Sequence, residues 1–273
     1  MLIWPKQVGQ LLLLSYIAVT KHRVHVLPTA VSLALVLVPR RLLDRTPLRA
    51  LSGTPLDATV GVIDVVGLAE RDPGQHGTAL AGIIAADGRL RGIAPQVQLL
   101  SVQAFTPDPA NVGSGSSSSD KIARAIDVAV DQGARVLNLS IRRSFERGAV
   151  IVAAVGNDGQ EKTRFPAAFE EVIAVTATDA RDRLYTQANR GSFVGVAAPG
   201  VDIVTTGPGN SIQSLSGTSM AAAYVSGVAA LLLERDPTLK PAEVRALIEA
   251  STIDLGAPGR DNEYGSGRVD AFR

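Results

Sequence analysis

From about residue 58 onward, short apolar runs alternate with stretches of helical pattern. Five runs are apolar at most positions: 59–63 (TVGVI), 97–104 (VQLLSVQA), 135–141 (RVLNLSI), 149–155 (AVIVAAV) and 172–177 (VIAVTA). Nearly continuous Val, Ile and Leu over this length is typical of strands that are buried on both faces, as in a parallel sheet. The pattern therefore predicts five buried strands.

Four segments have a helical pattern, over about 76–86, 119–133, 219–234 and 240–251. The second runs from a serine suited to an N-cap to a glycine suited to a C-cap. The third is apolar nearly all round, as expected for a helix in the middle of a protein. Strands that alternate with helices predict an α/β fold, with a mostly parallel sheet flanked by helices. In the fourth helix we expect the inner face to consist of Val244, Leu247 and Ile248.

The first 50 residues have a different pattern. Apolar runs at 11–19 and 31–38 are each followed by basic residues, and both are too short to span a bilayer. The first run could belong to a signal peptide, but no clear small-x-small cleavage site follows it. We favour the other reading, in which both runs are strands of a small leading module over 1–50. One large domain over 51–273 would follow.

Composition excludes several classes of function. The chain has 273 residues, 46% of them hydrophobic and only 4% aromatic, so a sizeable core must consist mainly of aliphatic side chains. The net charge of +1 gives no electrostatic reason to expect nucleic acid as a partner. The absence of cysteine excludes thiol catalysis and cysteine-bound zinc. GSGSSS at 113–118 and GPGNSI at 207–212 both miss the dinucleotide fingerprint, so we predict no cofactor.

Two titratable residues stand where catalytic groups are often found. Histidine is the commonest general base, and outside the leading module the chain has one, His76, at the start of a predicted apolar helix. Asp64 ends the first predicted strand, at the edge where parallel sheets place their sites. Each has an ordinary alternative: a polar residue at a helix start for His76, and a turn or cap residue for Asp64.

Two further polar residues complete the set. Ser219 opens the predicted central helix, where the helix field favours a developing negative charge, although it or Thr218 could simply be an N-cap. Asn157 follows a strand in VAAVGNDG, and its amide could donate to an oxyanion, although turn chemistry alone also explains it. Asp, then His, then Ser is one of the chain orders known for the serine triad.

These residues lie in collinear sequence blocks that cover most of 58–273. The blocks are VGVID ending at Asp64, HGT at 76–78 with AG at 81–82, AAVGN ending at Asn157, FPA at 165–167, VAAPG at 196–200 and SGTSMAAAYVSG at 216–227. In these blocks the chain resembles the subtilisin-like (subtilase) serine peptidases. The serine block and the HGT block together are highly specific for that family.

The resemblance implies a serine endopeptidase that acts through an acyl-enzyme intermediate. Ser219 would be the nucleophile, His76 its general base, Asp64 the residue that orients the base, and Asn157 an oxyanion donor. The segments implied to line the substrate groove add four candidates for binding an extended peptide: Leu139, Ser140, Ala154 and Gly156.

The resemblance also implies partners and a location. The substrate would be a polypeptide, and residues 1–50 would be a propeptide that blocks the active site. Family habit favours a secreted or periplasmic protein. Nothing in the sequence indicates a membrane span. We assign no metal, because no compact acidic ligand cluster is visible.

The chain departs from the family pattern at two links. The segment between Asp64 and His76 is short for the family, and the link over 142–148 (RRSFERG) is short for a crossover between parallel strands. We favour the absence of loops near 65–70 and 141–144 over real deletions that reshape the groove. A reshaped groove would favour the alternative function, a subtilase-like binding or regulatory protein with little turnover.

Overall fold

The computed structural model describes residues 59–64, 75–104, 106–107, 115–116, 119–138 and 148–271. The predicted leading module over 1–50 lies outside these residues. So do the two links near 65–70 and 141–144 and the groove candidates Leu139 and Ser140.

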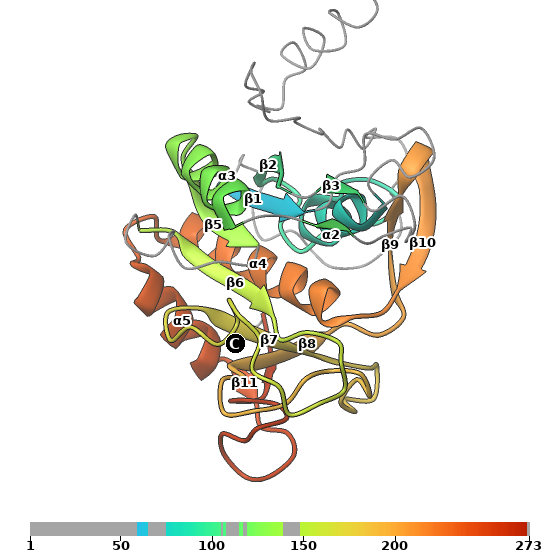
Figure 1. The fold of residues 1–273 in the computed structure, drawn as a ribbon, viewed down its shortest axis with the longest axis vertical. Coiled ribbons are helices and arrows are strands. Elements are labelled where there is room, and N and C mark those ends of the chain that lie inside the picture. The colour runs from blue at the N-terminus through green and yellow to red at the C-terminus, as the bar shows by residue number, and fades with distance from the viewer. Residues whose placement is uncertain are drawn as a thin grey trace, which may run out of the picture.

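An eight-stranded sheet forms the centre of the described structure (Figure 1). The strand order is β11-β12-β8-β7-β6-β5-β1-β2. Every neighbouring pair is parallel except β11 and β12, which confirms the prediction of a mostly parallel sheet. The strands are β1 (Thr59–Asp64), β2 (Gln98–Gln103), β5 (Ala134–Asn138), β6 (Val150–Ala154), β7 (Ile173–Thr178), β8 (Val196–Pro199), β11 (Thr252–Ile253) and β12 (Arg268–Val269).

The four predicted helices are confirmed to within two residues at most ends. They are α2 (Gln75–Ala85), α3 (Ser119–Asp131), α4 (Thr218–Arg235) and α5 (Pro241–Ala250). Two small antiparallel pairs were not predicted. They are β3 (Thr106–Pro107) with β4 (Gly115–Ser116), and β9 (Ile203–Gly207) with β10 (Ser211–Leu215), where the short turn η2 (Pro208–Asn210) joins β9 to β10.

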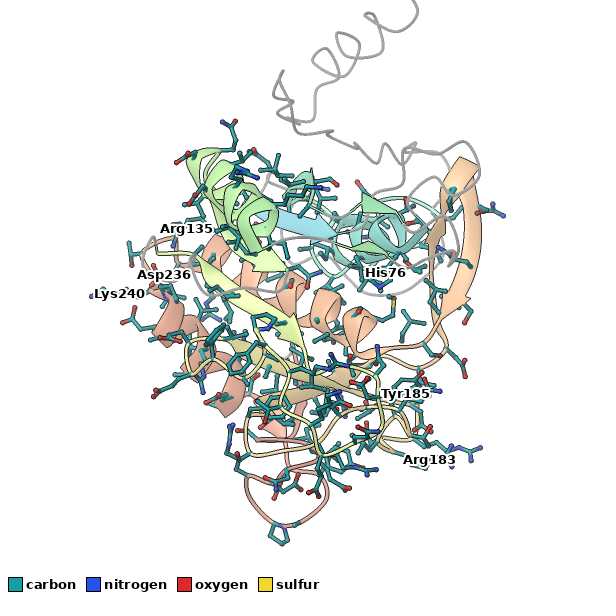
Figure 2. The ribbon with its side chains drawn as sticks, viewed as in Figure 1. His76, Arg135, Arg183, Tyr185, Asp236 and Lys240 are labelled. Atoms are coloured by element: carbon teal, nitrogen blue, oxygen red, sulfur yellow. The ribbon has the colours of Figure 1, made fainter. Side chains whose placement is uncertain are left out.

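One arginine ties the sheet to the connection between α4 and α5. The Arg135 guanidinium, on β5, donates to the carbonyl oxygens of Pro237 at 3.0 Å and Leu239 at 3.1 Å. Figure 2 shows Arg135 beside Asp236 and Lys240, which belong to that connection. The carboxyl end of α4 is therefore held against the sheet.

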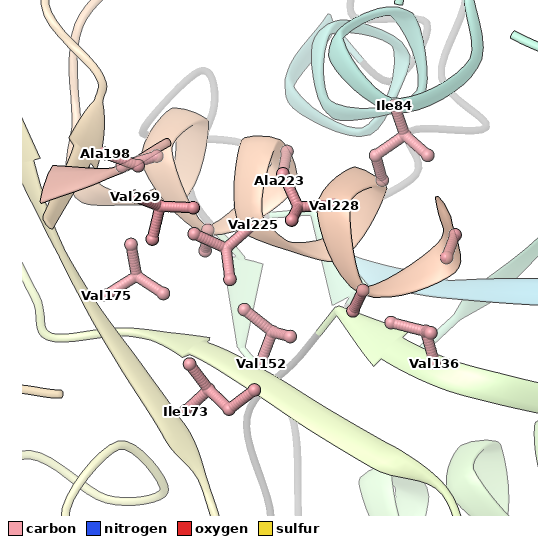
Figure 3. Packing of buried hydrophobic residues seen from close by; sticks show 14 of the residues in the cluster. Ile84, Val136, Val152, Ile173, Val175, Ala198, Ala223, Val225, Val228 and Val269 are labelled. Atoms are coloured by element: carbon pink, nitrogen blue, oxygen red, sulfur yellow. The ribbon is translucent and has the colours of Figure 1, made fainter. Parts of the chain in front are cut away.

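The core lies on both faces of the sheet. Helices α2, α4 and α5 pack on one face of the sheet, together with Val150 and Val152 of β6. Figure 3 shows Val152 within this cluster. Ile151 and Ala153 belong to a cluster on the other face, where α3 also packs. Burial on both sides explains why the strand runs are apolar at nearly every position. Helix α4 is apolar all round because it contacts α2 and α5 as well as β5 to β8.

Strands β5 and β6 are adjacent and parallel, with Val136 paired to Val150. Residues 139–149 join them, which is a short connection for a parallel crossover. Because the two strands are parallel neighbours, the sequence argument about the length of their link applies to this pair. The course of the link, and the choice between an absent loop and a real deletion, lie outside the described residues.

Candidate active site

The four predicted catalytic residues come from one end of the sheet and the helices beside it. Asp64 is the last residue of β1, and Asn157 follows the end of β6. Because both strands belong to the parallel part of the sheet, both residues lie at its carboxyl edge. His76 and Ser219 are the second residues of α2 and α4, two helices that pack together. In Figure 2, His76 lies at the end of α2 nearest the first turn of α4.

Helix α2 is fixed from the side opposite α4. The hydroxyl of Thr205 donates to the carbonyl oxygen of Ala79 at 2.7 Å, and that of Thr206 donates to the carbonyl oxygen of Thr78 at 2.8 Å. All four residues are buried. The first turns of α2, which carry His76, are therefore held between α4 and the β9–β10 hairpin.

Ser219 is not a helix cap. The N-cap of α4 is Gly217, and no side chain caps the helix. Gly217 has φ of 157° and ψ of 159°, a conformation that glycine adopts most readily, and its N–H donates to the carbonyl oxygen of Gly200 at 2.7 Å. The capping interpretation is therefore wrong for both Ser219 and Thr218. The half-buried Ser219 lies inside the first turn, near the positive end of the helix dipole.

Asn157 is joined directly to the residue before Ser219. Its Oδ1 accepts hydrogen bonds from the Thr218 backbone N–H and from the Thr218 hydroxyl, both at 3.0 Å. The Thr218 hydroxyl in turn accepts from the Gly156 N–H at 3.3 Å. Only the amide oxygen can accept from a backbone N–H, so the orientation of the Asn157 side chain follows from these contacts. Its oxygen is engaged by α4, and its NH₂ group is the end with hydrogen-bond donors.

The loop after β6 also carries an ion pair. Arg164 donates to the carboxylate of Asp158 from Nε at 2.9 Å and from Nη2 at 2.6 Å. The hydrogen bond from Arg164, reinforced by one from Asn189, lowers the pKa of Asp158 from 3.8 to about 2. The Asp158 carboxylate next to Asn157 therefore stays charged at a lower pH than an ordinary aspartate does.

Two of the four groove candidates lie within the described residues. Ala154 is the last residue of β6, and Gly156 follows two positions later; both are half-buried. Both lie on the segment that leads to Asn157, next to the first turn of α4.

Sequence reasoning missed two residues that shape this site. Thr218 was considered only as a rival cap, and no local pattern drew attention to Asn189, which binds the loop after β6 from a distant part of the chain. The position of Thr218 directly before Ser219 could have indicated that it shapes the site. For Asn189 the sequence offers no comparable signal.

No group of three or more histidine, aspartate or glutamate side chains gathers around a potential metal position in the part of the chain that the structure describes. Within that same part, every helix is too short or too polar to cross a membrane.

Comparisons with known proteins point to one family. The model of the subtilase family matches residues 67–267. A thermophilic serine proteinase from Bacillus sp. strain AK1 is 40% identical over 218 residues, which are 74% of this chain and 52% of that protein. The minor extracellular protease Epr of Bacillus subtilis strain 168 is 32% identical over 216 residues, 73% of this chain and 33% of that one. The chain thus spans about half or less of these relatives.

Among solved structures, the prenylagaramide maturation protease PagA superposes with a TM-score of 0.68 at 28% identity. The superposition covers 80% of this chain and 94% of that one, so the likeness extends over nearly the whole of the solved domain. The match to the family model and the likeness of fold both agree with the mostly parallel sheet and with helix α4 packed against it. The chain belongs to the subtilase family.

Proposed function

We propose that this protein is a serine endopeptidase in which Ser219 is the nucleophile, His76 the general base and Asp64 the residue that orients the base. The observation that carries the proposal is the joint between Asn157 and Thr218. Asn157 accepts two hydrogen bonds from Thr218, the residue before Ser219, and this contact supports the proposed roles of Asn157 and Ser219. Membership of the subtilase family supports the same roles.

The reaction would proceed in two stages. The Ser219 hydroxyl attacks the carbonyl carbon of the scissile peptide bond while its proton passes to the His76 imidazole. The tetrahedral intermediate carries a negative oxygen, which accepts hydrogen bonds from the Asn157 NH₂ group and the Ser219 backbone N–H. His76 then gives its proton to the departing amine, and the acyl group remains on Ser219. A water molecule, deprotonated by His76, attacks the ester carbonyl; His76 then returns this proton to the Ser219 oxygen as the ester bond breaks and the acid product leaves.

The Asp64 carboxylate would accept a hydrogen bond from His76 and stabilise the imidazolium that forms during each stage. Its position at the end of β1 supports this role, because a strand end fixes the backbone from which the side chain extends. Substrate would bind as an extended peptide along the groove candidates, which are Leu139, Ser140, Ala154 and Gly156.

The proposal also includes a role for residues 1–50 and a location for the protein. Residues 1–50 would act as an inhibitory propeptide over the groove. Export to a secreted or periplasmic location is favoured by the extracellular protease among the relatives.

A second candidate is a binding or regulatory protein that keeps the subtilase fold but turns over little substrate. The short connection between β5 and β6 favours it, because that connection follows Leu139 and Ser140 of the groove. A damaged groove would lower turnover without removing the nucleophile.

Labelling with a fluorophosphonate probe separates the two candidates. The full chain and the chain without residues 1–50 are treated with the probe, and the adduct is located by mass spectrometry. A peptidase gives an adduct on Ser219 that Ser219→Ala abolishes, together with cleavage of an unfolded protein substrate. Labelling without cleavage would favour the regulatory candidate, and the absence of labelling in both forms would contradict the assigned nucleophile.

A further inference from the structure

Asn189 is a fully buried polar residue that the proposed mechanism does not use. It has no exposed surface, and it follows the bend at 179–187, far in sequence from the loop after β6. A buried amide costs free energy unless its donors and acceptors are all paired. The hydrogen-bond partners of Asn189 therefore show which groups its buried amide is needed to hold.

Within the described structure, the Asn189 side chain makes its hydrogen bonds to the loop that carries Asn157. Its Oδ1 accepts from the N–H groups of Asp158 at 3.0 Å and Gln160 at 3.4 Å. Its Nδ2 donates to the carbonyl oxygen of Val155 at 3.2 Å and to Oδ2 of Asp158 at 2.9 Å. These contacts lie on both sides of Asn157 in the sequence.

The backbone of Asn189 adds a further contact on the same loop. Its N–H donates to the carbonyl oxygen of Gly156 at 3.0 Å. The two segments approach so closely that a Cβ on Gly156 would lie 2.6 Å from Nδ2 of Asn189. Gly156 also has φ of +101°, which side chains other than hydrogen rarely allow. The close approach and the positive φ restrict the loop at Gly156, and Asn189 lies against it.

We propose that Asn189 is a positioning residue for the oxyanion donor Asn157. Asn189 fixes the backbone at Val155, Gly156 and Asp158, and the Thr218 contacts fix the side-chain oxygen of Asn157. Together they determine where the Asn157 NH₂ group points. An oxyanion donor acts through its distance from the oxygen that becomes charged, so a small displacement of this loop weakens catalysis without removing any reacting group. The inference rests on the proposed peptidase function and on the role of Asn157 in it.

The test is a double-mutant cycle between Asn189 and Asn157, measured on the full chain in its active form with a chromogenic peptide substrate. Asn189→Asp keeps the size and the acceptor oxygen but loses the Nδ2 donor to Val155 and Asp158. Asn157→Ala removes the oxyanion donor itself, and its expected loss in kcat is about 10²–10³-fold, the range known for removing this kind of donor from subtilisin.

If Asn189 acts through Asn157, Asn189→Asp lowers kcat by about 10-fold or more in the unaltered background while KM changes little. In the Asn157→Ala background the same substitution changes kcat less than about twofold, because the group that it positions is gone. An equal loss of kcat in both backgrounds, or no loss in a folded Asn189→Asp protein, overturns the proposal.

A stability control and a second measurement guard against a merely structural effect. Ile248→Ala removes buried volume in α5, away from the site, and should lower Tm without lowering kcat. If Asn189→Asp does not fold, Asn189→Ser takes its place in the same cycle. Asn189 variants should also weaken binding of a peptide boronic acid, which mimics the tetrahedral intermediate, while the affinity for a product peptide stays the same. Equal weakening of both ligands overturns the proposal.

Failure of the positioning role and failure of the proposed function give different results. If fluorophosphonate labels Ser219 but the cycle shows no coupling, only the role of Asn189 is wrong. If Ser219 is not labelled in the unaltered chain, the peptidase assignment itself is wrong, whatever the Asn189 variants do.

Discussion

The side-chain oxygen of Asn157 accepts two hydrogen bonds from Thr218, the residue directly before Ser219. This contact joins the loop after β6 to the first turn of α4, although the two segments are far apart in the sequence. It leaves the NH₂ end of the amide as the end that carries hydrogen-bond donors. A turn residue would need neither contact, so the arrangement favours the oxyanion role.

The first prediction concerns the Thr218 hydroxyl, which is fully buried. Thr218→Val removes the donor to Asn157 Oδ1 and the acceptor for the Gly156 N–H. We expect a loss of about 1–3 kcal/mol in the free energy of unfolding, since a polar group loses its partner. We also expect kcat to fall by about 10-fold, because Asn157 is less well placed. Urea unfolding and steady-state kinetics would measure the two effects.

Thr218→Ser is the matched control, because it keeps the hydroxyl and loses only a methyl group. It should retain most of the kcat that Thr218→Val loses. If the serine and valine variants are equally impaired, the hydroxyl is not what positions Asn157.

The second prediction concerns the proposed triad. Ser219→Ala and His76→Ala should each lower kcat to a similar residual rate, because nucleophile and base act as a unit. The double variant should be no slower than either single one. Single-turnover kinetics on a peptide ester would measure all three. Near-normal turnover in His76→Ala would contradict the assignment of the base.

The third prediction concerns acid stability. The backbone N–H of Arg183, followed by its side chain, donates to Asp179 and lowers the pKa of that carboxyl from 3.8 to about 2. A carboxyl whose pKa is depressed in the folded state stabilises that state above pH 3.8, and the stabilisation is lost as the pH falls toward 2. The Asp179→Asn variant should therefore be less stable than the unaltered protein at pH 6.

The difference between the two proteins should shrink between about pH 4 and pH 2, where the carboxyl of the unaltered protein takes up its proton. Thermal unfolding across this range, followed by circular dichroism, would measure it. A stability difference that stays constant down to pH 2 would contradict the depressed pKa of Asp179.

The fourth prediction uses two neighbouring residues of α5. Ile248 is fully buried, whereas Leu247 is 45% exposed. Ile248→Ala should lower the free energy of unfolding by about 2–5 kcal/mol, because it leaves a cavity in the core. Leu247→Ala should cost much less, since the side chain is already partly in water. Equal losses would mean that α5 packs through a different face.

The sheet strands β8, β11 and β12 were not predicted, because their two to four residues are too short for a clear apolar run. The other five strands of the sheet and the covering helices could be predicted, because burial on both faces leaves apolar residues at nearly every strand position. Val150, Ile151, Val152 and Ala153 show this directly, since they point alternately into different core clusters. The β9–β10 hairpin has no such continuous apolar run. It lies beside α2 with Val204 58% exposed, so its pattern mixes apolar and polar positions without a clear period. The expected inner position of Leu247 was wrong for a related reason, because helical spacing identifies a stripe but not its edge.

Residues of the candidate site could be predicted where they follow a strand or lie at the start of a helix. Asp64, His76, Asn157 and Ser219 all stand at such positions, and the structure places each of them at an element end. The contribution of Asn189 was not predictable, because it depends on a contact between distant loops. Such contacts follow from the completed fold and leave no periodic pattern in the sequence.

Helix α4 packs against strands β1, β5, β6, β7 and β8 and against helices α2 and α5, and its first turn donates hydrogen bonds to Asn157. The proposed nucleophile therefore lies on the most extensively packed helix of the described structure. Its proposed partners lie on β1, α2 and the loop after β6, which are distant in sequence, so they would come together only after these elements have folded. A partly folded copy of the chain would therefore lack the proposed site, and peptidase activity, if the proposal holds, would begin only after folding.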